Sequence, residues 1–339
     1  MMVRTGLLAA VALASLATPA AAQSVAEFYQ GKSVDVVVGS GAGGGYDIYA
    51  RLLARRMGEY IPGKPTLIVK NVVGGGGIRA ATLLYNVSPK DGSVIATVSR
   101  AMITAPALGV ESAKFDASKF TWLGNLTGED SVCISWHTTP VKTWDDMLKN
   151  KLIVGTAAPG TSTYTFPALL KNMFGAKFDM VTGYPDASQA VLALERGEVQ
   201  AICQTFSTIK ANHPSWIKDG TANVLTVVGM RRNADIPDVP ATAEFAKTDE
   251  QRQIIKIILG PELIGRPFFA PPGLPADRTA ALRDAFTKVA KDKDFLADAA
   301  RQNLEVDPTG GQAIQDMIAD ILSAPPAMMA KAQAMLAKE

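Results

Sequence analysis

Short apolar runs alternate with amphipathic stretches along the first hundred residues. Ser33–Val38 is rich in β-branched residues and predicts a buried strand; glycines follow it, and then apolar residues at helical spacing up to Met57. Thr66–Asn71 and Ser93–Val98 repeat the strand pattern, with a second glycine loop and a predicted helix, Ile78–Tyr85, between them. Such repeated strand–loop–helix units favour a parallel sheet with helices on both faces.

A second set of alternating patterns begins near Gly124. Thr143 is a suitable N-cap for one helix, and Ser188–Arg196 carries the pattern of another. A further helix is expected to end at Phe174, after a glycine-containing loop over residues 158–163. The strands expected in this part of the chain cover residues 131–136, 152–156, 178–182, 199–203 and 224–228.

The order of these patterns predicts an α/β protein of two lobes. Lobe 1 is expected to contain residues 23–124. Lobe 2 is expected to contain residues 125–228. The remaining residues, 229–339, consist of proline-rich turns and helices and are expected to return to lobe 1.

Three glycine-containing loops occupy equivalent places, each between a predicted strand and the following helix. They give three candidate anion sites, at residues 43–47, 74–78 and 160–163. The unpaired N–H groups and the dipole at a helix start favour a bound anion, and glycine lets the backbone approach it closely. One such loop is often only a tight turn, whereas three at equivalent positions indicate an anion-binding region.

The first 22 residues have the pattern of a signal peptide. Arg4 supplies a positive charge, residues 6–16 form a short apolar core, and Ala20 and Ala22 fit the small-residue cleavage rule. The core is shorter than the roughly 20 residues of a membrane-spanning helix, so an N-terminal anchor is the less favoured alternative. We expect an exported, periplasmic protein that begins near Gln23.

Composition and charge narrow the class of protein further. The chain has 339 residues, of which 47% are hydrophobic, which is enough for a large core. It has 34 basic and 32 acidic residues, so that without Arg4 the counts are 33 and 32, and no run of five like charges occurs. We therefore expect no nucleic-acid partner.

Residues for metal or nucleophilic chemistry are scarce. The two histidines and two cysteines cannot form a four-cysteine zinc site and lack zinc-finger spacing. No G-x-S-x-G motif occurs, and neither His137 nor His213 neighbours a nucleophile motif. We predict no metal, no catalytic residue and no enzymatic activity.

Gly39–Gly44 formally matches the dinucleotide-binding pattern G-x-G-x-x-G. That site also needs an acidic residue at the end of the next strand, to bind the ribose. The next strand ends at Lys70 and Asn71, where the acid is missing. A Rossmann-type oxidoreductase is therefore a minor alternative, and no cofactor is expected.

Cys133 and Cys203 each lie in a predicted buried strand. An exported protein experiences an oxidising compartment, which permits a disulfide if the two strands are neighbours. Two buried free thiols, acting as small hydrophobic residues, are the other possibility. The sequence alone leaves both open.

Several short motifs follow one another in a specific order along the chain. The first is Ala42–Arg51, with three glycines before Tyr-Asp, and the second is Asn71–Gly77. Later come Gly155–Ser162, Gly183–Asp186 and Gly197–Gln200. In order and spacing these motifs resemble the Bug family, the periplasmic solute-binding receptors of tripartite tricarboxylate transporters.

The resemblance to the Bug family implies a periplasmic-binding-protein (Venus flytrap) fold. In that fold each of two α/β lobes is a mostly parallel sheet flanked by helices, and crossing strands join the lobes. A small organic carboxylate would bind between the lobes and be delivered to the membrane permease subunits of a tripartite tricarboxylate-type transporter. The alternative is a sensing receptor of the same fold that acts in signalling. We expect a monomer.

The family motifs imply ligand-binding residues on both lobes. In that family the glycine loops hold a carboxylate largely through backbone N–H groups and ordered water. Two strand-end residues, Ser99 and Gln204, are expected to face the same cleft. The residues assigned in this way are Ser40, Gly44, Gly45, Tyr46, Asp47, Gly76, Gly77, Ser99, Gly160, Thr161, Ser162, Thr163, Tyr184 and Gln204.

Some positions depart from the Bug pattern. Pro185-Asp186 stands in place of Lys-Gly, Tyr164 in place of a common His, and Gln204 in place of a common acid. Val72-Val73 replaces Arg-Pro in the second motif. These changes leave Tyr164, Tyr184 and Gln204 to contact the far end of the ligand. They would suit an aromatic ligand, a monocarboxylate or a ligand with an uncharged tail.

Two charged residues beside the glycine loops have competing interpretations. Arg100 follows the carboxyl end of a predicted strand, where it either pairs with a ligand carboxylate or is simply exposed. Asp47 stands at a helix start, and its charge would repel a bound carboxylate. We therefore interpret Asp47 as holding the loop backbone or a water in place.

Overall fold

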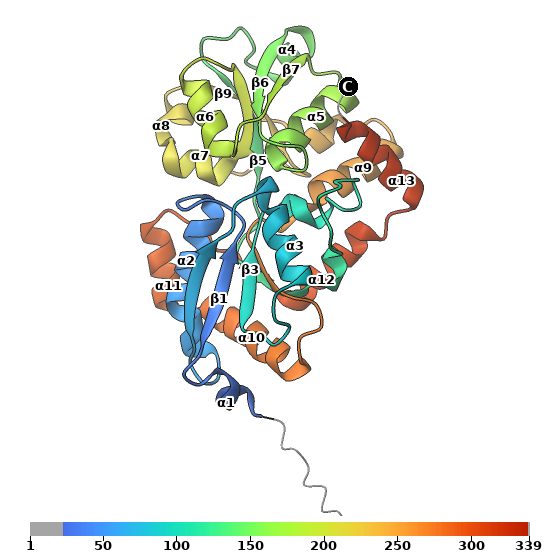
Figure 1. The fold of residues 1–339 in the computed structure, drawn as a ribbon. Helices are drawn as coiled ribbons and strands as arrows, with labels where there is room; N and C mark the ends of the chain where they lie inside the picture. Colours follow the sequence, from blue (N-terminus) through green and yellow to red (C-terminus); the bar gives the residue numbers. More distant parts are fainter. Residues whose placement is uncertain (1–22, 338–339) are drawn as a thin grey trace, which may run out of the picture.

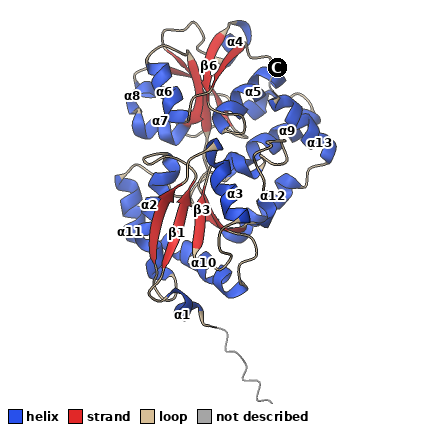
Figure 2. Cartoon of the chain, in the orientation of Figure 1, coloured by secondary structure: helices blue, strands red, loops and turns tan. Residues whose placement is uncertain are grey.

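The computed structural model describes residues 23–337, which form two α/β lobes stacked one above the other (Figure 1). The expected signal peptide, residues 1–22, lies outside the described residues. Each lobe contains one β-sheet with helices on both faces (Figure 2). Among the helices of residues 23–337, none is long and apolar enough to cross a membrane.

Lobe 1 is built on a six-stranded sheet in the order β11-β4-β10-β3-β1-β2. β1 pairs in parallel with both β2 and β3, while β10 runs antiparallel between β3 and β4. Four of the six strands therefore share one direction. The strands are β1 (Ser33–Val38), β2 (Thr66–Asn71), β3 (Val94–Thr97), β4 (Thr121–Asn125), β10 (Pro267–Ala270) and β11 (Thr309–Gly310).

The two faces of this sheet carry separate apolar clusters because neighbouring strand residues point to opposite sides. Phe268 belongs to the cluster beneath α2, α10 and α11, and the adjacent Phe269 belongs to the cluster beneath α3 and α12. The helical segments of this lobe are α1 (Val25–Tyr29), α2 (Gly45–Tyr60), η1 (Gly75–Gly77), α3 (Ile78–Asn86), η2 (Arg100–Ile103), η3 (Ala117–Lys119), α10 (Ala276–Val289), α11 (Lys293–Arg301) and α12 (Gly311–Leu322).

Lobe 2 has a five-stranded sheet in the order β7-β6-β8-β5-β9, in which only β5 runs against the other strands. α4 and α5 cover one face, and α6, α7 and α8 cover the other. The elements are β5 (Ser131–Trp136), α4 (Trp144–Lys149), β6 (Leu152–Thr156), α5 (Ser162–Phe174), β7 (Phe178–Thr182), α6 (Ala187–Glu195), β8 (Ala201–Thr205), α7 (Phe206–Asn212), α8 (Pro214–Lys218), β9 (Ala222–Val228) and η4 (Thr242–Phe245).

We expected all of residues 229–339 in lobe 1, but two helices of this segment pack against lobe 2. The isoleucine-rich face of α9 (Asp249–Leu259) joins the apolar cluster of α4 and α5, and α13 (Pro326–Leu336) contacts α5 and α9. The chain therefore passes between the lobes three times: after β4, through η5 (Gly260–Leu263) into β10, and between α12 and α13. Figure 1 shows the last passage at the side of the molecule.

A disulfide joins Cys133 of β5 to Cys203 of β8. The two strands are antiparallel neighbours, and their register sets these residues directly opposite each other. Both side chains are buried. The pairing that the sequence left open is thus explained by strand register.

Reduction of this disulfide is expected to lower the free energy of unfolding by about 4 kcal/mol, the chain-entropy value for a loop of this length. The bridged residues are 70 positions apart. Denaturant unfolding of one preparation, with and without reductant, measures the difference. Cys203→Ala, which cannot form the bridge, should not respond to reductant. Alkylation of two thiols in the denatured, unreduced protein would contradict the bridge.

Candidate functional site

A cavity of about 260 Å³ lies between the lobes, at the carboxyl ends of β1, β3 and β8. Sites for drug-sized ligands usually measure roughly 300–1,000 Å³, so this cavity suits a small metabolite. Ten of the fourteen residues assigned from the sequence line it, and they come from both lobes. They are Ser40, Gly44, Gly45, Tyr46, Gly76, Ser99, Thr161, Ser162, Thr163 and Gln204.

Four assigned residues, Asp47, Gly77, Gly160 and Tyr184, lie outside the cavity lining. Gly77 packs against Val98, which a Cβ on Gly77 would approach to 2.9 Å. Gly160 lines a second cavity, on the α13 side of the lobe boundary. Tyr184 packs with the apolar cluster beneath α6, α7 and α8. The structure therefore sets Tyr184 apart from the ligand cavity, contrary to expectation.

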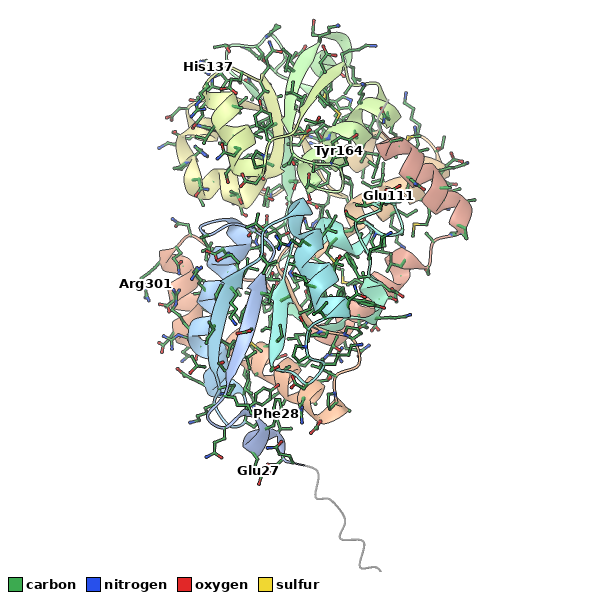
Figure 3. The ribbon with its side chains drawn as sticks, viewed as in Figure 1. Glu27, Phe28, Glu111, His137, Tyr164 and Arg301 are labelled. Carbon is green, nitrogen blue, oxygen red and sulfur yellow. A yellow bond between two sulfur atoms is a disulfide. The ribbon has the colours of Figure 1, made fainter. Side chains whose placement is uncertain are left out.

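Tyr164, the other tyrosine expected to reach the ligand, is also directed elsewhere. It is 4% exposed and lines the second cavity, of about 550 Å³. Glu111, of lobe 1, lines the same cavity, and Figure 3 shows both residues close to the boundary between the lobes. Of the three residues expected to contact the far end of the ligand, only Gln204 faces the central cavity.

The first glycine loop leaves the start of α2 open toward the cavity. Gly44 is the N-cap and supplies no side-chain hydrogen bond to the helix. The first N–H groups of an α-helix have no partner within the helix. They therefore remain available to an anion at this end of the cavity, where the helix dipole adds partial positive charge.

Asp47 holds this loop together, as we inferred from its position. Its carboxylate accepts hydrogen bonds from the Gly43 N–H (2.8 Å), Arg51 Nε (2.9 Å) and Asn71 Nδ2 (2.9 Å). Asn71 Nδ2 also donates to the carbonyl of Ser40, which ties the second glycine loop to the first. Burial alone raises the pKa of Asp47, but these hydrogen bonds outweigh it, so the pKa lies below its ordinary value.

Asp47→Asn is expected to lower the free energy of unfolding by about 1.5–3 kcal/mol, the range for hydrogen bonds to a charged group. The pKa of Asp47 is lower in the folded chain, so its contribution is present above the ordinary carboxyl pKa of 3.8 and is lost as the pH falls below it. Unfolding of both proteins between pH 7 and pH 3 measures this. Asp249→Asn, at a side chain that is 90% exposed, is the control. If the difference in the free energy of unfolding between wild type and Asp47→Asn stayed constant from pH 7 to pH 3, the assignment would be contradicted.

The second and third glycine loops meet across the lobe boundary. Gly76 has φ +64°, and a Cβ there would lie 2.6 Å from Thr161 Cγ2 of lobe 2. Thr161 donates to the carbonyl of Ala158 and shares a hydrogen bond with Thr163. These hydroxyls shape the loop before α5. The N–H of Tyr164 donates to the carbonyl of Thr161, the N-cap, whereas the helix N–H groups before it have no partner within the helix.

Arg100 is buried rather than exposed, and it pairs with a protein carboxylate. It is 2% exposed and forms an ion pair with Glu262 of η5. Burial alone would lower the pKa of Arg100, but the charge of Glu262 outweighs it and raises the pKa above the ordinary value. Ser131, at the start of β5, donates to Glu262 at 2.8 Å. The pair therefore connects lobe 1 with the two central passages between the lobes.

Arg266 was not anticipated from the sequence. It is 2% exposed, lines the cavity, and forms an ion pair with Glu129 at 2.9 Å. Its guanidinium lies over the rings of Tyr46 (4.7 Å) and Tyr49 (5.1 Å). The only sequence signal was an arginine directly before the apolar run Pro267–Ala270, which we had not predicted to be a strand.

Several donors lack an acceptor at this end of the cavity. Within residues 23–337, neither Ser40 Oγ nor Arg266 Nε has a hydrogen-bond partner, although both atoms are buried. The hydroxyl of Tyr46 accepts from the N–H and Nη1 of Arg100, at 3.1 and 3.4 Å, which leaves its own proton to donate. Ser40, Tyr46, Arg266 and the start of α2 all line the cavity from lobe 1, so this wall carries several hydrogen-bond donors, which suit an anion.

Among residues 23–337, no group of three or more His, Cys, Asp or Glu side chains is placed to hold a metal ion. His137 lies on lobe 2, far from the lobe boundary (Figure 3). Several hydrogen-bond donors line the cavity, and such groups suit an oxyanion.

Residues 49–333 match the sequence pattern of the tripartite tricarboxylate transporter family receptor. This range covers most of the chain. The match includes the second glycine loop, the third loop before α5, and both buried arginines.

Three solved structures share the fold. The periplasmic binding protein BugD has a TM-score of 0.70 and 21% sequence identity, over 90% of this chain and 98% of that one. MatC from Rhodopseudomonas palustris with bound malate has a TM-score of 0.67 and 20% identity, over 90% of this chain and 99% of that one. Another R. palustris protein, with adipate, has a TM-score of 0.69 and 19% identity, over 90% of this chain and 97% of that one. These similarities confirm the expected two-lobe binding-protein fold.

Proposed function

The chain belongs to the tripartite tricarboxylate transporter receptor family, whose members are solute receptors and not enzymes, and from that premise we propose that it captures a small organic carboxylate between its two lobes. The observation that carries this proposal is the set of buried donors without acceptors beside the start of α2. Ser40 Oγ and Arg266 Nε are both of this kind. A ligand carboxylate supplies the acceptors that both groups need.

The carboxylate binds at the lobe 1 wall, on the N–H groups at the start of α2. Tyr46 donates its hydroxyl proton to the same carboxylate, since Arg100 already occupies the acceptor side of that hydroxyl. Gly76, Ser99 and the loop at Thr161 complete the cavity from both lobes. Proteins of the same fold are known with malate and with adipate, which are both carboxylates.

Export and delivery follow from the same proposal. Residues 1–22 act as a signal peptide, so the mature receptor works in the periplasm as a monomer. It delivers its ligand to the permease subunits of a tripartite tricarboxylate-type transporter. The alternative is a receptor that presents its closed form to a signalling partner. Genes for such a permease beside the receptor gene favour delivery, and their absence favours sensing.

A thermal-shift panel of mono-, di- and tricarboxylates tests the proposal. A ligand present at 100 times its Kd adds about 2.7 kcal/mol to the free energy of unfolding, which moves the midpoint by several degrees. The amide of each active acid is the matched control, because it keeps the carbon skeleton and lacks the charge. Equal shifts with acid and amide, or no shift with any acid, would refute carboxylate capture.

A further inference from the structure

The charges around the cavity are almost fully neutralised by the protein itself. Among the described residues, three charged side chains line it: Arg100, Arg266 and Asp186. Each arginine is paired with a buried glutamate, Glu262 or Glu129. Asp186 is held as the N-cap of α6 by accepting from the Gln189 N–H at 3.0 Å, so its charge stays at the cavity.

These charges allow one ligand carboxylate and disfavour a second. The start of α2 and the free Nε of Arg266 serve one carboxylate at the lobe 1 wall. A second carboxylate at the lobe 2 wall would have only the start of α5 and neutral side chains to bind it, without an unpaired cation, and it would share the cavity with Asp186. Like charges at short range raise the free energy of the complex.

The lobe 2 wall is made mainly of neutral hydrogen-bonding groups. Nine such side chains of lobe 2 line the cavity. The hydroxyls of Thr161, Thr163 and Ser207 already bond within the protein. The other six residues are Ser162, Ser188, Gln204, Thr205, Thr208 and Asn212. A ligand whose far end is a hydrocarbon would bury these groups without partners, at a cost in free energy. A ligand hydroxyl can both donate to them and accept from them.

Gln204 is the best positioned of these groups. Its Oε1 accepts from the Thr205 N–H at 2.9 Å, which leaves the amide NH₂ to donate into the cavity. The preceding residue, Cys203, is bridged to Cys133, and Gln204 pairs with Val132 in the neighbouring strand. The strand that carries this amide is therefore fixed by a covalent cross-link.

We propose that the ligand is a small monocarboxylate with a hydroxyl or a similar uncharged polar group at its far end, contacted by Gln204. This inference rests on the proposed function and narrows its ligand class. It separates this receptor from the neighbours of the same fold that hold malate or adipate, which carry a carboxylate at both ends.

Calorimetric titration with matched acids tests the inference. Hexanoate, 6-hydroxyhexanoate and adipate have the same number of carbons and differ only at the far end; butyrate, 4-hydroxybutyrate and succinate form a shorter set. In at least one set the hydroxy acid is expected to bind at least tenfold more tightly than the other two. Tightest binding of a dicarboxylate or of an unsubstituted acid would overturn the inference and leave carboxylate capture intact. No binding in either set, with no shift in the broad panel, would refute both.

Two variants connect the preference to named residues. Gln204→Leu removes the amide and should reduce the advantage of the hydroxy acid over the unsubstituted acid to less than threefold. Asp186→Asn keeps an N-cap residue without the charge and should improve dicarboxylate binding several-fold. Gln253→Leu, at an exposed position of α9 outside the cavity, is the matched control and should change neither ratio. If Gln204→Leu, like the control, left the affinity ratio of hydroxy acid to unsubstituted acid unchanged, the assigned contact would be overturned.

Discussion

Gly45→Val is expected to abolish ligand binding, with a loss of at least about 100-fold, or about 2.7 kcal/mol. A Cβ at Gly45 would lie 2.8 Å from Arg266 Nη2 and 3.3 Å from its Cζ. Arg266 cannot move aside cheaply, because it is buried, paired with Glu129 and packed on Tyr46. The valine side chain therefore displaces the guanidinium or covers the helix start that binds the carboxylate.

Calorimetry with the tightest acid of the panel measures this loss, and circular dichroism checks that the variant is folded. Gly310→Ala is the matched control. Gly310 has nothing within 4 Å of its Cβ position and lies outside the cavity lining. Unchanged affinity in folded Gly45→Val would show that the first glycine loop is not the binding site.

Gly76→Ala is expected to weaken binding by at least about tenfold, or 1.4 kcal/mol, because it obstructs the contact between the lobes. The added Cβ would lie 2.6 Å from Thr161 Cγ2, and Gly76 has a positive φ of 64° that an alanine adopts with strain. Thr161→Ser removes Cγ2 and keeps a good N-cap for α5. In the Gly76→Ala background, Thr161→Ser should therefore restore most of the affinity.

Small-angle scattering gives this prediction a second measurement. The radius of gyration of the wild-type protein is expected to decrease with saturating ligand. In Gly76→Ala the decrease is expected to be smaller. One helix start contributes roughly 0.3–1 kcal/mol to binding an anion, up to about 2 when partly buried, whereas micromolar affinity needs about 8 kcal/mol. Both lobes must therefore contribute. An unchanged radius of gyration, with normal affinity in Gly76→Ala, would mean that lobe 1 binds alone.

Local sequence predicted much of the fold because several strands are uninterrupted β-branched runs bounded by turn residues. Ser33–Val38, Thr66–Asn71 and Ser131–Trp136 coincide with β1, β2 and β5. α9 and α13 were placed in the wrong lobe, because an apolar helix face does not reveal which sheet it covers. The short β10 escaped prediction, since Pro267–Ala270 begins with a proline and contains no β-branched residue.

The glycine loops of the candidate site were also evident from sequence, because their conformation is fixed by neighbours along the chain. The buried arginines were not, since each depends on a glutamate far away in sequence: Arg100 on Glu262 and Arg266 on Glu129. The prediction that Tyr164 contacts the ligand was wrong for a related reason. Its position next to a correctly placed loop did not determine which of two cavities its ring would enter.

The passage from α12 to α13 limits how the lobes can move relative to each other. If only the two central connections joined the lobes, the lobes could both bend and twist about the common axis of these connections at a low cost in free energy. A third connection displaced to one side acts as a tether with a lever arm, because α12 packs on β4 in lobe 1 while α13 packs on α5 in lobe 2. Torsion would stretch this tether, whereas rotation about a line through all three passages leaves its length unchanged. The soft motion of the molecule is then a single swing that opens the cavity on the side away from α13.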